Sequence, residues 1–247
     1  MRLIVFGGTT EGRLLSCEMA RLGAAVTVCV ATEYGKEEQG EQPGVEVRAG
    51  RLDGEQMRAA VAGADLCVDA THPYAAEASR NIRSACEQAG VRRLRLLREQ
   101  SQLPAGAAVF PTAGDAAAWL KDTKGNILLA TGAKELGAFA DLGGERLYPR
   151  VLPLASSLDA CAAAGVPRSN IVALQGPFSQ ELNEALIRQF RIRFLVTKDG
   201  GQAGGFQEKA DAAAATGIQL VLIRRPEDSG MNYDTVLRQC REMMACG

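Results

Sequence analysis

The segment RLIVFGGTTEGR, residues 2–13, decides the fold class of this chain. Residues 3–6 are apolar and have the length of a buried strand, and a helical pattern begins directly after the glycines. A glycine-rich turn between a first strand and a first helix is typical of doubly wound α/β proteins. The turn lets a phosphate approach the backbone, and the helix N-terminus supplies free N–H donors. The segment therefore predicts a dinucleotide-binding unit.

The glycine spacing differs from the two common phosphate-binding fingerprints. Gly7, Gly8 and Gly12 are one and four residues apart, whereas G-x-G-x-x-G needs glycines two and three apart. Arg13 and Leu14 stand where a Walker loop needs Lys and Ser or Thr. The pattern favours a nucleotide site that is not a P-loop.

The segment ATEYGK, residues 31–36, bears on which cofactor binds. An NAD site usually places an acid about 20 residues past the glycines, and an NADP site places an arginine there. Glu33, next to Thr32, favours NAD, while Lys36 is able to meet a phosphate. The alternative for Glu33 and Lys36 is that both are solvated loop charges. The alternative for the glycine segment at residues 7–12 is an ordinary strand-to-helix turn capped by Thr9 or Thr10.

Short β-branched runs alternate with alanine-rich segments of helical period, which predicts β-α-β units and parallel sheets. The alternation breaks at residues 100–114, where neither a strand nor a helix pattern survives. We therefore predict two Rossmann-like, doubly wound α/β domains, residues 1–100 and 101–247, with a cleft between them. Expected strands span residues 3–6, 25–31, 45–48, 66–70, 93–97, 126–131, 146–150, 171–174, 194–197 and 219–223. Expected helices span residues 11–22, 55–61, 74–89, 156–164, 179–190 and 233–244.

Composition excludes several classes of protein. With 28 Lys and Arg against 29 Asp and Glu, no global basic field attracts nucleic acid or an anionic membrane, and an aromatic content of 5% offers little stacking surface for RNA. Seven cysteines without a C-x-x-C pair and a single histidine predict reduced thiols and no metal site. We expect a cytoplasmic protein, because the apolar start is too short for a signal sequence and no run reaches about 18 apolar residues.

The segment DATHPY, residues 69–74, follows the fourth predicted strand, at the end where open α/β sheets bind ligands. Thr71 or His72 is expected to cap the next helix, with Pro73 in its first position and Tyr74 beside it. His72 is the only histidine and is able to donate to a cofactor or act as an acid. The alternative is a histidine that only caps the helix or satisfies local hydrogen bonds.

Two similar segments in the second half each bring a threonine and a lysine to the end of a predicted strand. They are TGAKEL, residues 131–136, and TKDGGQAGG, residues 197–205. Dense glycine indicates close backbone approach to a ligand or a mobile loop. A ligand with negative charges could be held there, with Arg98 and Arg150 at other strand ends. The alternative for each of these charges is simple solvation.

The missing catalytic patterns narrow the range of enzymes. The chain has no G-x-S-x-G segment for a serine hydrolase. None of its four tyrosines is followed four residues later by lysine, so the Tyr-x-x-x-Lys pair of short-chain dehydrogenases is also missing.

Taken together, the segments resemble the precorrin-6A reductase family of corrin-ring (vitamin B12) biosynthesis, including its cobalt-precorrin-6A branch. The resemblance spans nearly the whole chain. It is carried by GGTTEGR at residues 7–13, DATHPYA at 69–75, TGAKEL at 131–136, LQGPFS at 174–179 and VTKDGG at 196–201.

The resemblance implies a two-domain reductase that transfers hydride from NAD(P)H to a double bond of a tetrapyrrole rich in carboxylates. VATEYG at residues 30–35 resembles the cobalt-dependent branch and implies NADH as the donor, with NADPH as the alternative. Expected cofactor-binding residues are Gly7, Gly8, Thr9, Thr10, Glu11, Gly12, Arg13, Thr32, Glu33, Thr71, His72, Pro73 and Tyr74. Expected substrate-binding residues are Arg98, Lys134, Arg150, Lys198, Gly200 and Gly201. Expected proton donors are Lys198, Asp199 and His72.

Two other functions stay open at this point. One is a non-catalytic dinucleotide-binding sensor, which would bind the cofactor tightly and reduce no tetrapyrrole. The other is an NAD(P)-dependent reductase acting on a different substrate. The oligomeric state and the presence of cobalt in the substrate are not indicated by any pattern in the chain.

Overall fold

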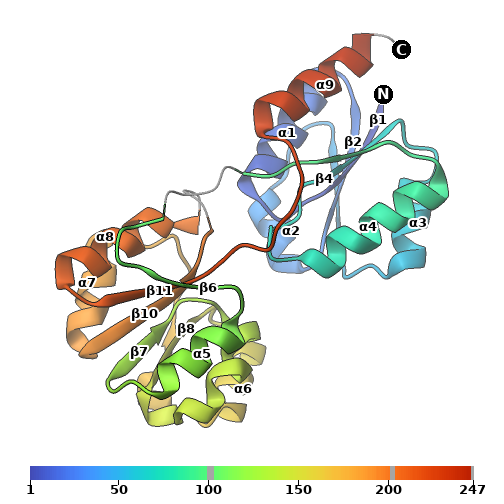
Figure 1. Ribbon diagram of the computed structural model, residues 1–247. Helices are drawn as coiled ribbons and strands as arrows, with labels where there is room; N and C mark the ends of the chain where they lie inside the picture. Colours follow the sequence, from blue (N-terminus) through green and yellow to red (C-terminus); the bar gives the residue numbers. More distant parts are fainter. Residues whose placement is uncertain (99–102, 201–203, 246–247) are drawn as a thin grey trace. The chain divides into compact units, whose positions relative to one another are not determined.

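The computed structural model describes residues 1–98, 103–200 and 204–245. The chain divides into two compact units, the first made of Met1–Glu99 and Pro226–Gly247 and the second of Gln100–Arg225. Each unit is a parallel sheet with helices on both faces (Figure 1). The two predicted doubly wound α/β halves are thereby confirmed.

The C-terminal segment corrects one predicted boundary. The sequence assigned residues 226–247 to the second domain, whereas they belong to the first unit. The reason is packing, because Val236 and Cys240 of the last helix are fully buried in the same core as Leu15 and Met19 of the first helix. Burying this apolar face stabilises the last helix against the first unit.

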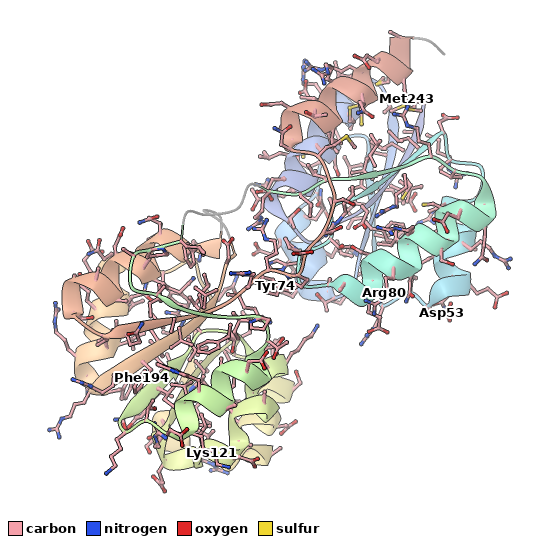
Figure 2. The ribbon with its side chains drawn as sticks, in the orientation of Figure 1. Asp53, Tyr74, Arg80, Lys121, Phe194 and Met243 are labelled. Atoms are coloured by element: carbon pink, nitrogen blue, oxygen red, sulfur yellow. The ribbon has the colours of Figure 1, made fainter. Side chains whose placement is uncertain are left out.

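The first unit has a five-stranded sheet in the order β3-β2-β1-β4-β5. Helices α1, α2 and α9 lie on one face of the sheet, and α3 and α4 lie on the other (Figure 1). Asp53, at the start of α3 in Figure 2, forms a capping box with Gln56. The elements are β1 (Arg2–Phe6), α1 (Thr10–Arg21), β2 (Ala25–Val30), α2 (Glu33–Gln39), β3 (Val45–Ala49), α3 (Gly54–Val61), β4 (Leu66–Asp69), α4 (Ala76–Ala89), β5 (Arg93–Arg95) and α9 (Tyr233–Ala245).

The chain that returns from the second unit pairs with the edge of this sheet. Met231 donates its N–H to the Arg95 carbonyl at 2.8 Å, and Leu97 donates its N–H to the Met231 carbonyl at 2.9 Å. Gly230 approaches so closely that a Cβ atom there would lie 2.8 Å from the Arg95 carbonyl oxygen. The edge beside β5 is therefore covered by a short segment from far along the chain.

The second unit has six parallel strands in the order β6-β11-β10-β7-β8-β9. Figure 1 shows α7 and α8 on one face of this sheet and α5 and α6 on the other. The elements are β6 (Ala108–Phe110), α5 (Ala113–Lys121), β7 (Asn126–Leu129), η1 (Ala133–Leu142), η2 (Gly144–Arg146), β8 (Leu147–Val151), α6 (Ala155–Ala163), η3 (Arg168–Asn170), β9 (Val172–Ala173), α7 (Gln180–Gln189), β10 (Ile192–Lys198), α8 (Phe206–Thr216) and β11 (Gln219–Ile223).

Residues 100–114, predicted to lack regular structure, contain the strand β6 and the start of α5. β6 pairs with β11, and the Thr112 hydroxyl caps α5 by accepting the Asp115 N–H at 3.1 Å. β6 has only three residues, all half-buried, so it lacks the apolar run by which the longer strands were predicted. Helices α2, α5 and α8 were not predicted either.

The strand orders place one topological switch point in each unit. In the first unit the chain builds outward from β1 through β2 to β3 and then returns to β4 on the other side of β1. In the second unit β7 leads outward to β8 and β9, and the chain then returns to β10 on the other side of β7. Ligands of open α/β sheets bind at the carboxyl ends of the strands that flank such a point. The candidate sites are therefore the loops after β1 and β4 and the loops after β7 and β10.

Candidate functional site

The Thr9 hydroxyl joins the two sequence motifs of the first unit. It donates to the Ala70 carbonyl at 2.9 Å and accepts the Gly12 N–H at 3.2 Å. Thr9 therefore caps α1, which was one part of the alternative interpretation of this turn, and Thr10 is the first helical residue. The glycine turn after β1 and the segment after β4 thus meet at the first switch point.

Two of the glycines have separate structural reasons. Gly8 has φ of +125°, and a Cβ atom built there would meet nothing within 4 Å, so its backbone is open to an approaching group. A Cβ atom on Gly12 would lie 2.7 Å from the Ala70 Cβ, so α1 approaches β4 closely only because this residue is glycine. These are the roles of close ligand approach and close helix packing that dinucleotide folds assign to glycine, at an altered spacing.

The segment after β4 corrects the predicted helix start. α4 begins at Ala76, and its N-cap is Ala75, whose side chain makes no capping bond. His72 and Tyr74 lie in a turn, closed by the Ala75 N–H donating to the His72 carbonyl at 2.8 Å, and their ring centroids are 5.5 Å apart in a stacked arrangement. Neither Thr71 nor His72 caps α4, and Pro73 is not its first residue.

A buried carboxylate holds this turn in place. Asp69, at the end of β4, is fully buried and accepts the Thr71 hydroxyl at 2.7 Å and the Thr71 N–H at 3.2 Å. Arg93 donates to its other oxygen, Oδ2, at 2.7 Å, and Arg95 donates at 3.0 Å to Oδ1, the oxygen that accepts from Thr71. A backbone turn closed by an aspartate side chain takes the place of the expected cap.

Other predicted residues of the first unit lie directly after β2 and beside the first turn of α1. Thr32 caps α2 by accepting the Gly35 N–H at 3.0 Å, so Glu33 is the first residue of an unexpected helix just after β2. Arg98, which the sequence predicts to bind substrate, donates to Glu11 at 3.0 Å. The structure therefore brings Arg98 to the first turn of α1, within the first unit.

An ion pair joins the two motifs of the second unit. Lys198, at the end of β10, donates to Glu135 at 2.6 Å, in the segment that follows β7. Thr131 in the same segment has a buried hydroxyl oxygen without a hydrogen-bond partner among the described residues. Asp199 is buried, with the Arg225 guanidinium 3.7 Å away. Lys134 is exposed, Gly200 follows Asp199, and Gly201 lies outside the described residues.

Two buried cations lie at the same edge of this sheet. Arg150 of β8 donates to the Asn183 side-chain oxygen at 2.7 Å, and its guanidinium stacks 4.2 Å above the Phe178 ring. Lys209, in α8, donates to the Gly204 carbonyl at 2.6 Å. Both side chains are about nine-tenths buried. Burial lowers the pKa of Arg150 to about 10, and burial together with Arg150 lowers that of Lys209 to about 8.

Such cations are costly to bury unless an anion joins them. Their contacts named above are a neutral amide, a carbonyl and an aromatic ring, and the one carboxylate among the described residues that acts on Lys209 is that of Glu208. Lys209 was not among the predicted site residues because α8 was not predicted. Helical spacing would have revealed it, since Phe206, Lys209, Ala210 and Ala213 fall on one face of a helix and all four are buried.

Metal clusters and membrane-spanning helices are absent from the described ranges. Within residues 1–98, 103–200 and 204–245, no group of three or more His, Cys, Asp or Glu side chains is placed to hold a metal ion. No helix in those ranges is long and apolar enough to cross a membrane. Two surface hollows, of about 410 and 290 Å³, are lined by residues outside the motifs, so the strand topology is the better guide to the site.

The fold and the first switch point define the class, a protein of two Rossmann-like units with a dinucleotide-type turn in the first. The chain belongs to the family described as precorrin-6x reductase CbiJ/CobK, whose model matches residues 2–246. Family membership makes it a reductase of corrin-ring biosynthesis, as the motif resemblance implied.

Similarity extends over most of the chain. A cobalt-precorrin-6A reductase of Methanothermobacter thermautotrophicus is 36% identical and aligned over 92% of this chain and 77% of its own. A precorrin-6A reductase of Rhodococcus erythropolis is 35% identical over 91% of this chain and 89% of its own. A solved structure titled CobK precorrin-6A reductase has a TM-score of 0.78 at 26% identity, covering 98% of this chain and 97% of its own.

Proposed function

We propose that this protein reduces one double bond of precorrin-6A or its cobalt form to the 6B product, using NADH. The observation that carries the proposal is the family match across residues 2–246, together with ligand-type residues at both switch points. Relatives named for the cobalt substrate and for the cobalt-free one are almost equally similar, so identity does not favour one of them. The cobalt form is proposed on the VATEYG segment.

The residues at the first switch point fit a nicotinamide dinucleotide. Gly7, Gly8 and Thr9, with Thr10 and Gly12 of α1, would hold the pyrophosphate, because the Gly8 backbone is open and α1 supplies free N–H donors. Glu33, after β2, would accept from the ribose hydroxyls, which favours NADH. When bound, the cofactor supplies the hydride.

The rest of the first site would surround the reactive end of the cofactor. The turn at Thr71, His72, Pro73 and Tyr74 would border the nicotinamide, since it lies across the switch point from the glycine turn. Glu11 would act through Arg98 by fixing the first turn of α1, and Arg13 adds a half-buried cation to that turn.

The second unit would hold the carboxylate arms of the tetrapyrrole. Arg150 and Lys209 are two buried cations with one neighbouring carboxylate in the described part of the chain, that of Glu208, so an added anion would balance their charge. Lys134, Lys198 and the Gly200 backbone lie at the neighbouring strand ends. Reduction adds one hydride and one proton to the ring. Lys198, Asp199 and His72 are the proposed proton donors, and a donor whose replacement leaves kcat unchanged is eliminated.

Anaerobic absorbance spectroscopy tests the function directly. The protein is mixed with precorrin-6A or its cobalt form, and NADH or NADPH is added in separate cuvettes. We expect loss of the reduced-nicotinamide absorbance together with a spectral shift of the macrocycle, faster with NADH. Folded protein that is silent with both substrates and both donors would refute the reductase. Binding of the dinucleotide without reduction would favour a sensor.

Replacing either buried cation should weaken tetrapyrrole binding selectively. Arg150→Met and Lys209→Met each remove a charge-assisted bond of about 1.5–3 kcal/mol, so KM for the tetrapyrrole should rise roughly 10- to 100-fold while KM for the cofactor stays the same. Lys121→Met, on the exposed end of α5 (Figure 2), is the matched control. Unchanged KM in both variants would remove these residues from the site.

The pKa of Lys209, lowered to about 8, predicts how substrate binding depends on pH. Lys209 is charged below pH 8 and loses its proton as the pH rises through this value, so kcat/KM for the tetrapyrrole should fall above about pH 8. The profile of Lys209→Met should be flat in that range. The sign for stability is opposite, because the folded protein binds fewer protons than the unfolded chain between the two pKa values. The contribution of Lys209 to the free energy of unfolding, taken as the difference between wild type and Lys209→Met, should therefore rise from about pH 8 to 10.5.

A further inference from the structure

We infer that Asp228 is a positioning residue for the turn after β4, acting through Arg95. The inference deepens the proposed function, since this turn would border the nicotinamide. The part of the inference that concerns structure, that Asp228 fixes the turn after β4 through Arg95, does not depend on which cofactor binds.

Arg95 contacts the turn and Asp228 at the same time. Its Nε donates to Asp228 Oδ2 at 2.7 Å, and its Nη1 donates to the Asp69 carboxylate at 3.0 Å and to the Thr71 carbonyl at 2.9 Å. The Arg95 side chain is 3% exposed. A guanidinium is planar and rigid, so an anchor on Nε fixes the direction in which Nη1 donates.

Asp228 also balances the charge of the buried cluster around Asp69. Arg93 and Arg95 both contact Asp69, which leaves one buried positive charge in excess. Asp228 supplies the second carboxylate, so the four side chains form a neutral cluster. Without Asp228, Arg95 would be drawn toward Asp69 or toward water, and its bond to the Thr71 carbonyl would weaken.

The backbone around Asp228 is itself held. Gly230 packs on the Arg95 carbonyl, and Met231 pairs with Arg95 and Leu97, so the carboxylate is presented by a fixed segment. Three residues before Asp228, Arg225 lies 3.7 Å from Asp199 in the second unit. The segment of residues 225–228 therefore forms an ion pair at each of its ends, between Arg225 and Asp199 in the second unit and between Asp228 and Arg95 in the first.

The experiment compares Asp228→Asn and Asp228→Ala with Glu227→Gln, which neutralises the exposed neighbouring acid. Hydrogen exchange of the protein without cofactor is measured over residues 70–76, and binding of NADH and NADPH is measured by nicotinamide fluorescence. Both Asp228 variants should exchange about fivefold or more faster over this turn and bind the cofactor roughly tenfold more weakly. The KM for the tetrapyrrole and the properties of Glu227→Gln should match the wild type.

The outcomes separate the inference from the function. A lower melting temperature with unchanged exchange and unchanged cofactor affinity would overturn the inference, because Asp228 would then only stabilise the fold. An equal loss in Glu227→Gln would overturn it as well. If Asp228→Ala does not fold, Asp228→Asn, which keeps the shape of the side chain, decides the matter. If the wild type binds neither dinucleotide, the proposed function fails while the exchange data still decide the role of Asp228.

Discussion

Replacing Asp69 by alanine is expected to destabilise the protein by about 3–5 kcal/mol, because two buried guanidinium groups lose their shared carboxylate. Asp69 is fully buried and contacts Arg93 at 2.7 Å and Arg95 at 3.0 Å. After the substitution Arg95 keeps its ion pair with Asp228, whereas Arg93, whose side chain is 14% exposed, loses this carboxylate and is poorly solvated. Cofactor binding should be lost in parallel, since the Thr71 turn is closed by this carboxylate. Urea unfolding and cofactor titration measure the two effects.

The control for this prediction is Asp65→Ala. Asp65 is exposed and accepts the Arg2 N–H at 2.6 Å, so its loss should cost about 1 kcal/mol or less. A loss below about 1 kcal/mol for Asp69→Ala would contradict the prediction, and would mean that water enters the cluster and solvates both arginines.

Gly12→Ala is expected to lower kcat/KM for the cofactor by about 100-fold. The added Cβ would lie 2.7 Å from the Ala70 Cβ, and neither atom belongs to a flexible side chain, so α1 has to move away from β4. Overpacking of this kind costs about 1–3 kcal/mol of stability. A displacement of about 1 Å at a binding turn is sufficient for a 100-fold loss. Steady-state kinetics and thermal unfolding together measure the two effects.

Gly54→Ala is the matched control, because Gly54 also stands at the start of a helix and an added Cβ there meets nothing within 4 Å. It should leave both kinetics and stability close to the wild type. Near-normal cofactor kinetics in Gly12→Ala would show that the glycine turn tolerates a shift of α1, and would remove the close packing of α1 as a requirement for binding.

The first glycine turn was predictable because its determinants are local. Thr9 caps α1 from three residues away, as the sequence indicated. The turn after β4 was not predictable, because Arg95 and Asp228, which lie 24 and 157 residues after Thr71 in the chain, hold it. Local rules favoured Thr71 or His72 as a cap, whereas the buried Asp69 carboxylate takes the Thr71 N–H and hydroxyl and delays the helix to Ala76.

In the second unit, too, some features were predictable from the sequence and others were not. The segments around Thr131 and Lys198 were expected at strand ends, and the parallel order places both at one switch point. The burial of Lys209 and its closeness to Arg150 depend on how α8 packs against the carboxyl edge of the sheet. Nothing in the sequence indicates that Arg150 is removed from water, and for Lys209 the one indication is its place on the apolar face of α8.

The sequence by itself determined the α/β class, the alternation of strands and helices, the glycine turn and the family. These follow from local periodicity, turn chemistry and short motifs, which act between residues close in the chain. Only the tertiary structure decided that the last helix joins the first unit, that Asp228 meets Arg95 across 133 residues, and that Arg150 and Lys209 are buried together. Such pairings depend on which apolar faces bury each other and on which charges are thereby removed from water, and neither is encoded in a local pattern.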